Sequence, residues 1–302
     1  MRRPTTVELM LLATILLWAL NLSVTKVILD HGLEPLSYAT IRYGLAGAIF
    51  VVLTLVAERS LRIERRHVGV LAFAAVTLWL NQLSFVYALD VTTASTIGLL
   101  LGAIPIFAAL FGLALGRERL TGRFWVAAAI SFAGVALVAL GSGGDVSGGY
   151  EGVLLGLATS ATWAAYSVAV TPLMQTYSPS RVSAVVIPLA WVLIALVGLP
   201  TTRGQDWSIG WEIWLLLVFA TLGPLVLTNV FWFRSLHRIG PARATLAANL
   251  QPFVAALLAV VLLSEPLGLL QVLGGILIAA GIFAARRRAP GPQATQVLES
   301  GP

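Results

Sequence analysis

Residues 92–116 read TTASTIGLLLGAIPIFAALFGLALG, a stretch without a single charged side chain. An α-helix of about 20 residues spans the hydrocarbon core of a bilayer. In hydrocarbon, the backbone N–H and C=O groups need partners within their own segment, which a helix provides and an open strand does not. The stretch therefore predicts a transmembrane helix, with Pro105 inside it.

Apolar stretches of similar length occur along nearly the whole chain. Of its 302 residues, 58% are hydrophobic and 11% are charged, whereas about 25% of a soluble domain is charged. No small-residue cleavage site follows Met1-Arg2-Arg3, so we interpret the first stretch as a helix and not as a removed leader. The sequence predicts an all-α integral membrane protein with ten transmembrane helices. They lie at roughly 7–28, 36–57, 67–89, 92–116, 122–141, 150–172, 181–200, 211–233, 241–264 and 267–285.

The cations between these spans predict the orientation. With the N-terminus inside, sixteen lie on the cytoplasmic side and Arg203 alone lies on the other, while Lys26 and Arg42 fall within spans. Cytoplasmic loops carry the excess of cations, so we predict a multi-pass protein of the cytoplasmic membrane with both termini in the cytoplasm. The cations form short clusters between apolar stretches, so the net charge of +6 does not indicate nucleic-acid binding. The sixteen are Arg2, Arg3, Arg59, Arg62, Arg65, Arg66, Arg117, Arg119, Arg123, Arg181, Arg234, Arg238, Arg243, Arg286, Arg287 and Arg288.

The second half of the sequence repeats the first at a shift of 147 residues, without a gap across about fifty residues, and at a shift of 145 in the opening helices, where Leu17-Trp18-Ala19 pairs with Thr162-Trp163-Ala164. The aligned pairs are Leu89 with Leu236, Pro105 with Pro252, Glu118 with Glu265 and Gly134 with Gly281. Each half holds five predicted spans, and an odd number inverts one repeat relative to the other. Inverted repeats are a recurrent plan of secondary transporters, whose substrate site lies between the repeats. A duplication kept only for packing is the alternative.

The predicted organisation follows from this repeat. Residues 1–141 form the first five-helix repeat, and 142–149 form an external Gly-rich linker. Residues 150–286 form the second five-helix repeat, and 287–302 form a cytoplasmic tail that we expect to be disordered.

Motifs in both halves resemble the EamA-type branch of the drug/metabolite transporter superfamily. The first half contains Leu17-Trp18-Ala19-Leu20-Asn21 followed by Lys26, then Arg42, Tyr87-Ala88-Leu89, Pro105 and Gly116-Arg117-Glu118-Arg119-Leu120. The second half contains Pro252 and Ser264-Glu265-Pro266-Leu267. The resemblance implies two EamA-like repeats around a central cavity, lined mainly by the first, third and fourth helices of each half. It also implies alternating access and transport of metabolites. The second half departs from this symmetry because it has no cation matching Lys26 or Arg42.

Charged side chains inside a span are costly and are candidates for function. Arg42 lies about 9 Å of helix inside the outer end of its predicted span. It either binds substrate or serves packing, bonded to neighbouring carbonyls or to Glu34. Lys26, the only lysine in the protein, either assists binding or pairs at the membrane interface with Asp30, its i+4 neighbour. No acidic residue lies mid-span, so an embedded positive field favours an anionic or zwitterionic substrate.

Uncharged polar and aromatic residues cluster in the helices that we expect to line the cavity. Such amides serve either substrate binding or helix association. The candidate substrate-binding residues, with the two cations, are Lys26, Arg42, Trp18, Asn21, Trp79, Asn81, Gln82, Tyr87, Trp163, Tyr166, Asn229, Trp232 and Asn249, and Gln251 also belongs to this polar group.

Prolines at equivalent positions also mark the expected cavity helices. Pro105 and Pro252 are candidate hinges, with a static kink as the alternative, and Pro188 and Gly223-Pro224 interrupt two further helices. The helices at 122–141 and 267–285 carry small-residue spacings instead, Ala129/Ala133 and Gly275/Ala279, which suggest close packing.

Three rival classes remain to be weighed. An enzyme is disfavoured because no catalytic motif or cluster of embedded acids occurs, and neither a cofactor nor a metal is expected. A channel fits inverted repeats poorly. A flippase for lipids or lipid-linked head groups is the alternative, and it predicts a lateral opening.

We therefore predict a secondary transporter that moves small organic metabolites, such as amino acids, most naturally by export. Its expected partners are a small-molecule substrate and membrane lipid, with no nucleic acid; the sequence leaves the oligomeric state open, a monomer included.

Overall fold

The computed structural model describes residues 6–116, 120–141, 149–239 and 247–286, and all regular elements in these ranges are helices. Glu118, most of the predicted linker at 142–149 and the predicted tail at 287–302 lie outside them. The first half contains α1 (Thr6–Asp30), α2 (Pro35–Glu58), η1 (Arg65–His67), α3 (Val68–Val91), α4 (Ala94–Leu100), η2 (Leu101–Ala103), α5 (Ile104–Ala114) and α6 (Gly122–Gly141). The second half contains α7 (Gly149–Val170), η3 (Leu173–Gln175), α8 (Pro179–Gly204), α9 (Trp211–Thr221), η4 (Leu222–Leu227), α10 (Thr228–Ile239), α12 (Gln251–Leu263) and α13 (Leu269–Arg286).

Eight helices in the described ranges are long and apolar enough to cross a bilayer, fewer than the ten that the sequence predicts. The missing two correspond to α12 and α13, whose apolar parts are shorter, Gln251–Leu263 and Leu269–Ala284. The start of the predicted ninth span, 241–246, lies outside the described residues, and α12 begins at Gln251, next to Pro252. Proline is favoured in the first turn of a helix because its missing N–H has no partner there anyway.

Two of the spans are interrupted helices. The predicted span at 92–116 is built from α4, the short 3₁₀ turn η2 and α5, and Pro105 lies in the first turn of α5. Pro252 has the same place in α12, so the two repeat-equivalent prolines both start a helical segment after a break. In the span Trp211–Trp232, a π-helical segment, η4, contains Pro224.

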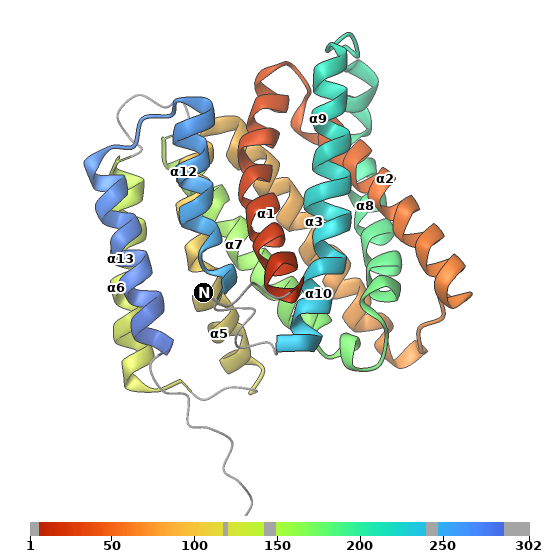
Figure 1. Cartoon of the computed structure of the whole chain (residues 1–302), viewed down its shortest axis with the longest axis horizontal. Coiled ribbons are helices and arrows are strands. Elements are labelled where there is room, and N and C mark those ends of the chain that lie inside the picture. The colour runs from red at the N-terminus through yellow and green to blue at the C-terminus, as the bar shows by residue number, and fades with distance from the viewer. Residues whose placement is uncertain (1–5, 117–119, 142–148, 240–246, 287–302) are drawn as a thin grey trace, which may run out of the picture.

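The packing of the helices fits an approximate two-fold symmetry between the two halves of the chain. Two pairs join helices in equivalent places, α2 with α8 and α6 with α13. Other pairs exchange under the same relation, because α3 packs against α7 as α1 packs against α10, and α5 packs against α7 as α12 packs against α1. Figure 1 shows α6 with α13 at one end of the molecule and α2 with α8 at the other.

The shift found in the sequence also relates individual contacts. The Ser131 hydroxyl donates to the carbonyl of Ile278, its equivalent 147 positions later. A Cβ at Gly134 would lie 2.6 Å from the Gly274 carbonyl, and a Cβ at Gly281 would lie 2.6 Å from the Ala127 carbonyl, the equivalent contact. The two helices pack closely through small residues, but through Gly134, Gly274 and Gly281 and not through the predicted pairs. Ala129 and Ala133 are exposed, and Gly275 and Ala279 line a groove between α12 and α13.

The pair α2 and α8 is joined at both ends by equivalent positions. At one end Glu58 bonds to Arg181, with an N–O distance of 2.7 Å, and accepts a hydrogen bond from the Ser178 hydroxyl. At the other end Gln205 accepts from the Glu34 backbone N–H at 2.8 Å and donates to the Gly32 carbonyl at 2.9 Å. Position 58 corresponds to 205, and 181 to 34, under the same shift. One end is thus closed by an ion pair and the other by a neutral amide.

Glu58→Gln should lower the melting temperature of the purified protein, because it removes charge-assisted bonds from a carboxylate that is only 22% exposed. Hydrogen bonds to charged groups contribute about 1.5–3 kcal/mol. Glu64→Gln is the matched control, since the Glu64–Arg66 pair is mostly exposed and should matter little. Equal melting temperatures for the two variants would contradict the prediction.

A second contact between the halves uses the repeated glutamate motif. Glu265, just after α12, accepts hydrogen bonds from the backbone N–H groups of Ala94 at 2.9 Å and Ser95 at 2.8 Å. These N–H groups open α4 and have no partners within the helix. A carboxylate is favoured there because the start of a helix carries a partial positive charge.

Candidate functional site

A polar cavity of about 120 Å³ lies between the two halves. Its walls come from α1, α2, α3, η2, α5, α7, η4 and the start of α12, so both repeats contribute. The lining residues are Trp18, Asn21, Leu22, Arg42, Tyr43, Asn81, Gln82, Phe85, Leu101, Ile104, Thr159, Trp163, Pro224, Leu225 and Gln251.

Arg42 is the one charged residue of this lining, and only 4% of it is exposed. Its Nη2 donates to Asn21 Oδ1 at 3.0 Å, and its Nε donates to the Ala220 carbonyl at 3.2 Å. The guanidinium carbon lies 5.6 Å from the centroid of the Tyr38 ring. All three partners are neutral, and Glu34 is not among them. These contacts therefore provide no counter-ion for the guanidinium at the cavity wall.

The acceptor at Ala220 exists because of Pro224. In an α-helix the carbonyl of residue 220 would accept from the N–H of residue 224, but proline has no N–H. The π-helical segment η4 begins two residues after Ala220, and such irregular segments leave backbone groups free for other partners. Arg42, from the other repeat, donates to this freed carbonyl. Pro224 thus helps to hold the guanidinium in place.

Aromatic rings form the neighbouring wall. Trp18 packs edge-on against Trp163, with ring centroids 6.5 Å apart, and its Nε1 donates to the Thr228 hydroxyl at 2.9 Å. On the outer side of this pair, Trp232 lies 5.3 Å from Trp18 and Tyr166 lies 5.5 Å from Trp163. The two lining tryptophans are therefore held in fixed orientations by a second layer of rings.

Amide groups supply the remaining polarity. Asn81 Nδ2 donates to the Thr159 carbonyl at 2.9 Å, which joins α3 to α7. Gln82 Nε2 donates to Asn81 Oδ1 at 3.4 Å. Among the described residues, the buried Gln82 Oε1 has no hydrogen-bond partner. It is an acceptor available to a ligand that carries a donor.

The structure places six of the thirteen predicted binding residues on the cavity wall, and Gln251 as well. The six are Trp18, Asn21, Arg42, Asn81, Gln82 and Trp163. The other seven lie elsewhere: Lys26, Trp79, Tyr87, Tyr166, Asn229, Trp232 and Asn249.

The outlying residues have other contacts. Lys26 Nζ lies 3.1 Å from Asp30 Oδ1. Lys26 thus forms the ion pair that the sequence analysis gave as the alternative to substrate binding. Asn229 accepts from the Ser183 hydroxyl at 3.3 Å, between α10 and α8. Tyr166 and Trp232 support the lining tryptophans from behind.

Sequence reasoning missed several lining residues. Thr159 could have been found, since it lies one helical turn before Trp163 on α7. Tyr43 follows Arg42 directly. The apolar members, such as Phe85 and Leu225, resemble lipid-facing residues in the sequence and carry no signal of their own.

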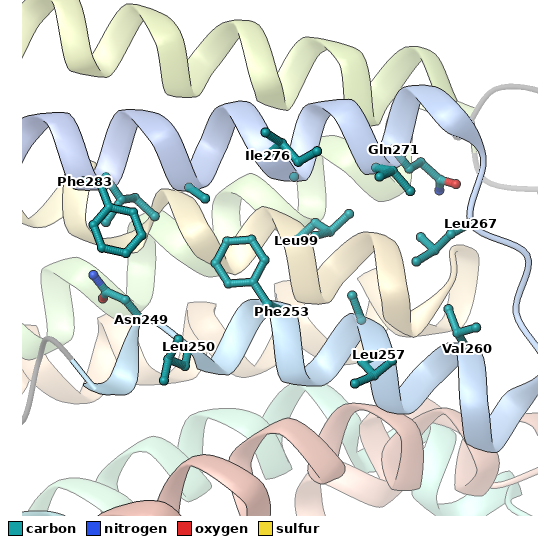
Figure 2. Close-up of a pocket in the computed structure, with 15 residues that line it drawn as sticks. Leu99, Asn249, Leu250, Phe253, Leu257, Val260, Leu267, Gln271, Ile276 and Phe283 are labelled. Atoms are coloured by element: carbon teal, nitrogen blue, oxygen red, sulfur yellow. The ribbon is translucent and has the colours of Figure 1, made fainter.

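A second hollow is an apolar groove of about 530 Å³ between α12 and α13, with Leu99 of α4 at its base. Figure 2 shows Asn249 and Phe283 at one end of it, and Gln271 and Leu267 at the other. Gln271 donates to the Thr96 hydroxyl and accepts from the Gly268 N–H. No residue lines both the groove and the polar cavity. The groove is therefore a separate feature of the outer surface of the bundle.

Taken together, an all-helical membrane protein of two related halves, with a polar cavity between them, belongs to the class of multi-pass membrane transporters. The sequence profile of the EamA-like transporter family matches residues 5–140 and 150–287, one copy in each half. The chain belongs to the EamA-like transporter family.

Relatives agree with this assignment. An uncharacterized transporter of Archaeoglobus fulgidus is 27% identical over 287 residues, which cover 91% of this chain and 96% of that protein. The uncharacterized transporter YdeK of Bacillus subtilis is 28% identical over 262 residues, covering 84% and 88%. A crystal structure with 22% identity superimposes with a TM-score of 0.64 over 94% of this chain and 97% of the other, and it supports the fold.

Proposed function

We propose that this protein is a secondary transporter that exports small organic metabolites bearing a carboxylate, such as amino acids or similar anionic or zwitterionic compounds. The observation that supports it is the lone guanidinium of Arg42 on the cavity wall. A planar guanidinium forms charge-assisted, bidentate hydrogen bonds with a carboxylate. The unpartnered Gln82 Oε1 is an acceptor for an ammonium or hydroxyl group of the same ligand.

In this proposal the cavity opens alternately to the two sides of the membrane. It lies among ten membrane spans that form two inverted repeats. In this proposal the eight long helices are joined by shorter ninth and tenth spans that contain α12 and α13. The breaks before Pro105 and Pro252 offer equivalent points at which the fourth and ninth spans bend, which supports their proposed role as hinges. The flippase alternative needs a lateral opening into the cavity. The groove between α12 and α13 does not favour it, because the two hollows share no lining residue.

Thermal stabilisation across a library of small metabolites tests the proposed substrate class. A ligand that binds only the folded protein raises its melting temperature by mass action. We expect stabilisation by a subset of carboxylates and none by the matching primary amides or esters. Stabilisation by cations alone, or equally by acids and amides, would contradict the proposal.

The proposed orientation, with both termini in the cytoplasm, predicts one-sided labelling of introduced cysteines. The protein has no cysteine, so a single one can be labelled without background. Ser208→Cys, in the exposed segment between α8 and α9, should react with an impermeant maleimide added to whole cells. Ser60→Cys, just after α2, should react only after the cells are opened. The reverse pattern would overturn the orientation.

A further inference from the structure

The charge balance of the polar cavity bears on how the transporter cycles. Among the described residues, Arg42 is the only charged side chain on the lining. Lys26 is paired with Asp30 and does not reach the cavity. Under the repeat shift, the counterpart of Arg42 is Leu189, so the second half supplies neither a second cation nor an anion. The empty cavity therefore holds one uncompensated positive charge.

Neutral dipolar groups stabilise this charge, and no counter-ion is among the contacts of the guanidinium. The Ala220 carbonyl, Asn21 Oδ1 and the Tyr38 ring are all neutral. Arginine is not deprotonated in proteins, so the charge cannot be relieved by proton loss. While the cavity is open to water, solvent and dissolved anions screen it.

Alternating access requires the cavity to be closed to both sides between its two open states. Enclosing an unpaired charge in a low-dielectric interior costs several kcal/mol even after relaxation. A bound monocarboxylate with no second charged group makes the contents of the cavity neutral and removes much of this cost, whereas a zwitterion leaves the net charge at +1. The loaded protein should therefore change state much faster than the empty one, since every 1.4 kcal/mol of barrier is about tenfold in rate.

We propose that the protein is an anion exchanger: it carries one carboxylate across the membrane only in return for another anion moving the opposite way. This inference rests on the proposed function, and it adds that net, one-way movement through the empty state is suppressed by Arg42. A coupling carboxylate is not needed in the protein, because the substrate itself supplies the neutralising charge.

The absence of native cysteine allows the empty state to be tested directly. Leu225→Cys places a thiol on the cavity wall. Its reaction with an impermeant methanethiosulfonate is measured from outside in washed right-side-out vesicles and from inside in inverted vesicles, so that no cytoplasmic carboxylates are present. The assay uses a buffer of bulky sulfonates, with or without an equimolar mixture of the twenty standard amino acids, acetate, lactate, pyruvate, succinate and malate.

Without the mixture, the thiol should react from one face at least about tenfold faster than from the other. The mixture should make it reactive from both faces. Adding Arg42→Gln should make the empty protein reactive from both faces, because the enclosed cavity is then neutral. Arg62→Gln, an exposed arginine between α2 and η1, is the matched control and should keep the one-sided pattern. Because a misfolded protein would also expose the thiol, two-sided reactivity of Arg42→Gln is counted only for a variant that is monodisperse and still melts cooperatively.

Equal reactivity from both faces in the empty parent protein would overturn the exchange inference, as would a one-sided pattern that persists in Arg42→Gln. Either result leaves the binding site intact if carboxylates still raise the melting temperature of the parent protein. If no anion in the mixture raises it, the proposed function itself fails, and the exchange inference falls with it.

Discussion

Arg42→Lys should weaken carboxylate binding nearly as much as Arg42→Gln, although lysine keeps the charge. Two nitrogens of Arg42 donate hydrogen bonds to Asn21 and to the Ala220 carbonyl while the guanidinium faces the cavity. The single ammonium nitrogen of a lysine cannot make both hydrogen bonds and also contact a ligand. Losing one charged partner of a desolvated pair costs about 2–5 kcal/mol, or roughly 30-fold or more in affinity. The ligand is the carboxylate that stabilises the parent protein most strongly in the metabolite screen.

Binding must be measured on purified, monodisperse protein, because Arg42 also ties α2 to α1 and to α9. If Arg42 serves only packing, both variants will show a lower folded yield and melting temperature, but the folded molecules will bind with the parent affinity. Retained affinity in Arg42→Gln would remove Arg42 from the site. Lys26→Gln is a useful comparison, since Lys26 is paired with Asp30 away from the cavity and its loss should change affinity little.

Pro224→Ala should weaken the same binding by about tenfold or more, although residue 224 offers a ligand no charge. Alanine restores an N–H at this position, which competes with Arg42 for the Ala220 carbonyl. A hydrogen bond to a charged group contributes about 1.5–3 kcal/mol. Proline in a helix interior is intrinsically unfavourable, so the variant should be at least as stable to heat as the parent protein. Lower affinity with unchanged or higher stability distinguishes positioning from general damage.

The coupling between the two residues gives a sharper measurement. In an Arg42→Gln background, Pro224→Ala should cause little further loss of binding, because residues that act through one interaction are not additive. Pro200→Ala, another proline within a helix but exposed and near the end of α8, is the matched control. Additive effects of the Arg42 and Pro224 changes would show that Pro224 acts on the site by another route.

The general architecture was predictable because hydrocarbon imposes a simple rule on sequence. A run of apolar residues must be helical in a bilayer, so the order of the helices followed from composition alone. The repeat was equally accessible, and the shift of 147 residues that aligns Pro105 with Pro252 reappears in the contact between Ser131 and Ile278. The count was less secure: a break in a helix, as before Pro252, does not interrupt apolar composition.

The lining of the cavity was only partly predictable, because a membrane helix is apolar on every side and its sequence does not mark which face is inward. Asn249 and Gln251 are two positions apart and chemically alike, yet Gln251 lines the cavity and Asn249 lines the outer groove. Trp79 and Asn81 of α3 are also two positions apart, and of the two only Asn81 lines the cavity. Within α3, a difference of two residues turns the helix by about 200°, and only packing decides which side faces the cavity, whereas Asn249 and Gln251 lie on either side of the start of α12.

The sequence by itself determined that Arg42 is a cation inside a span, that no acidic residue lies mid-span, and that Pro224 must free a carbonyl four residues before it. Only the tertiary structure decided that these two facts belong to one site. The Ala220 carbonyl and Arg42 are 178 residues apart and come from different repeats. A freed acceptor does not specify its donor, because which polar groups meet depends on how the helices pack across the two-fold relation.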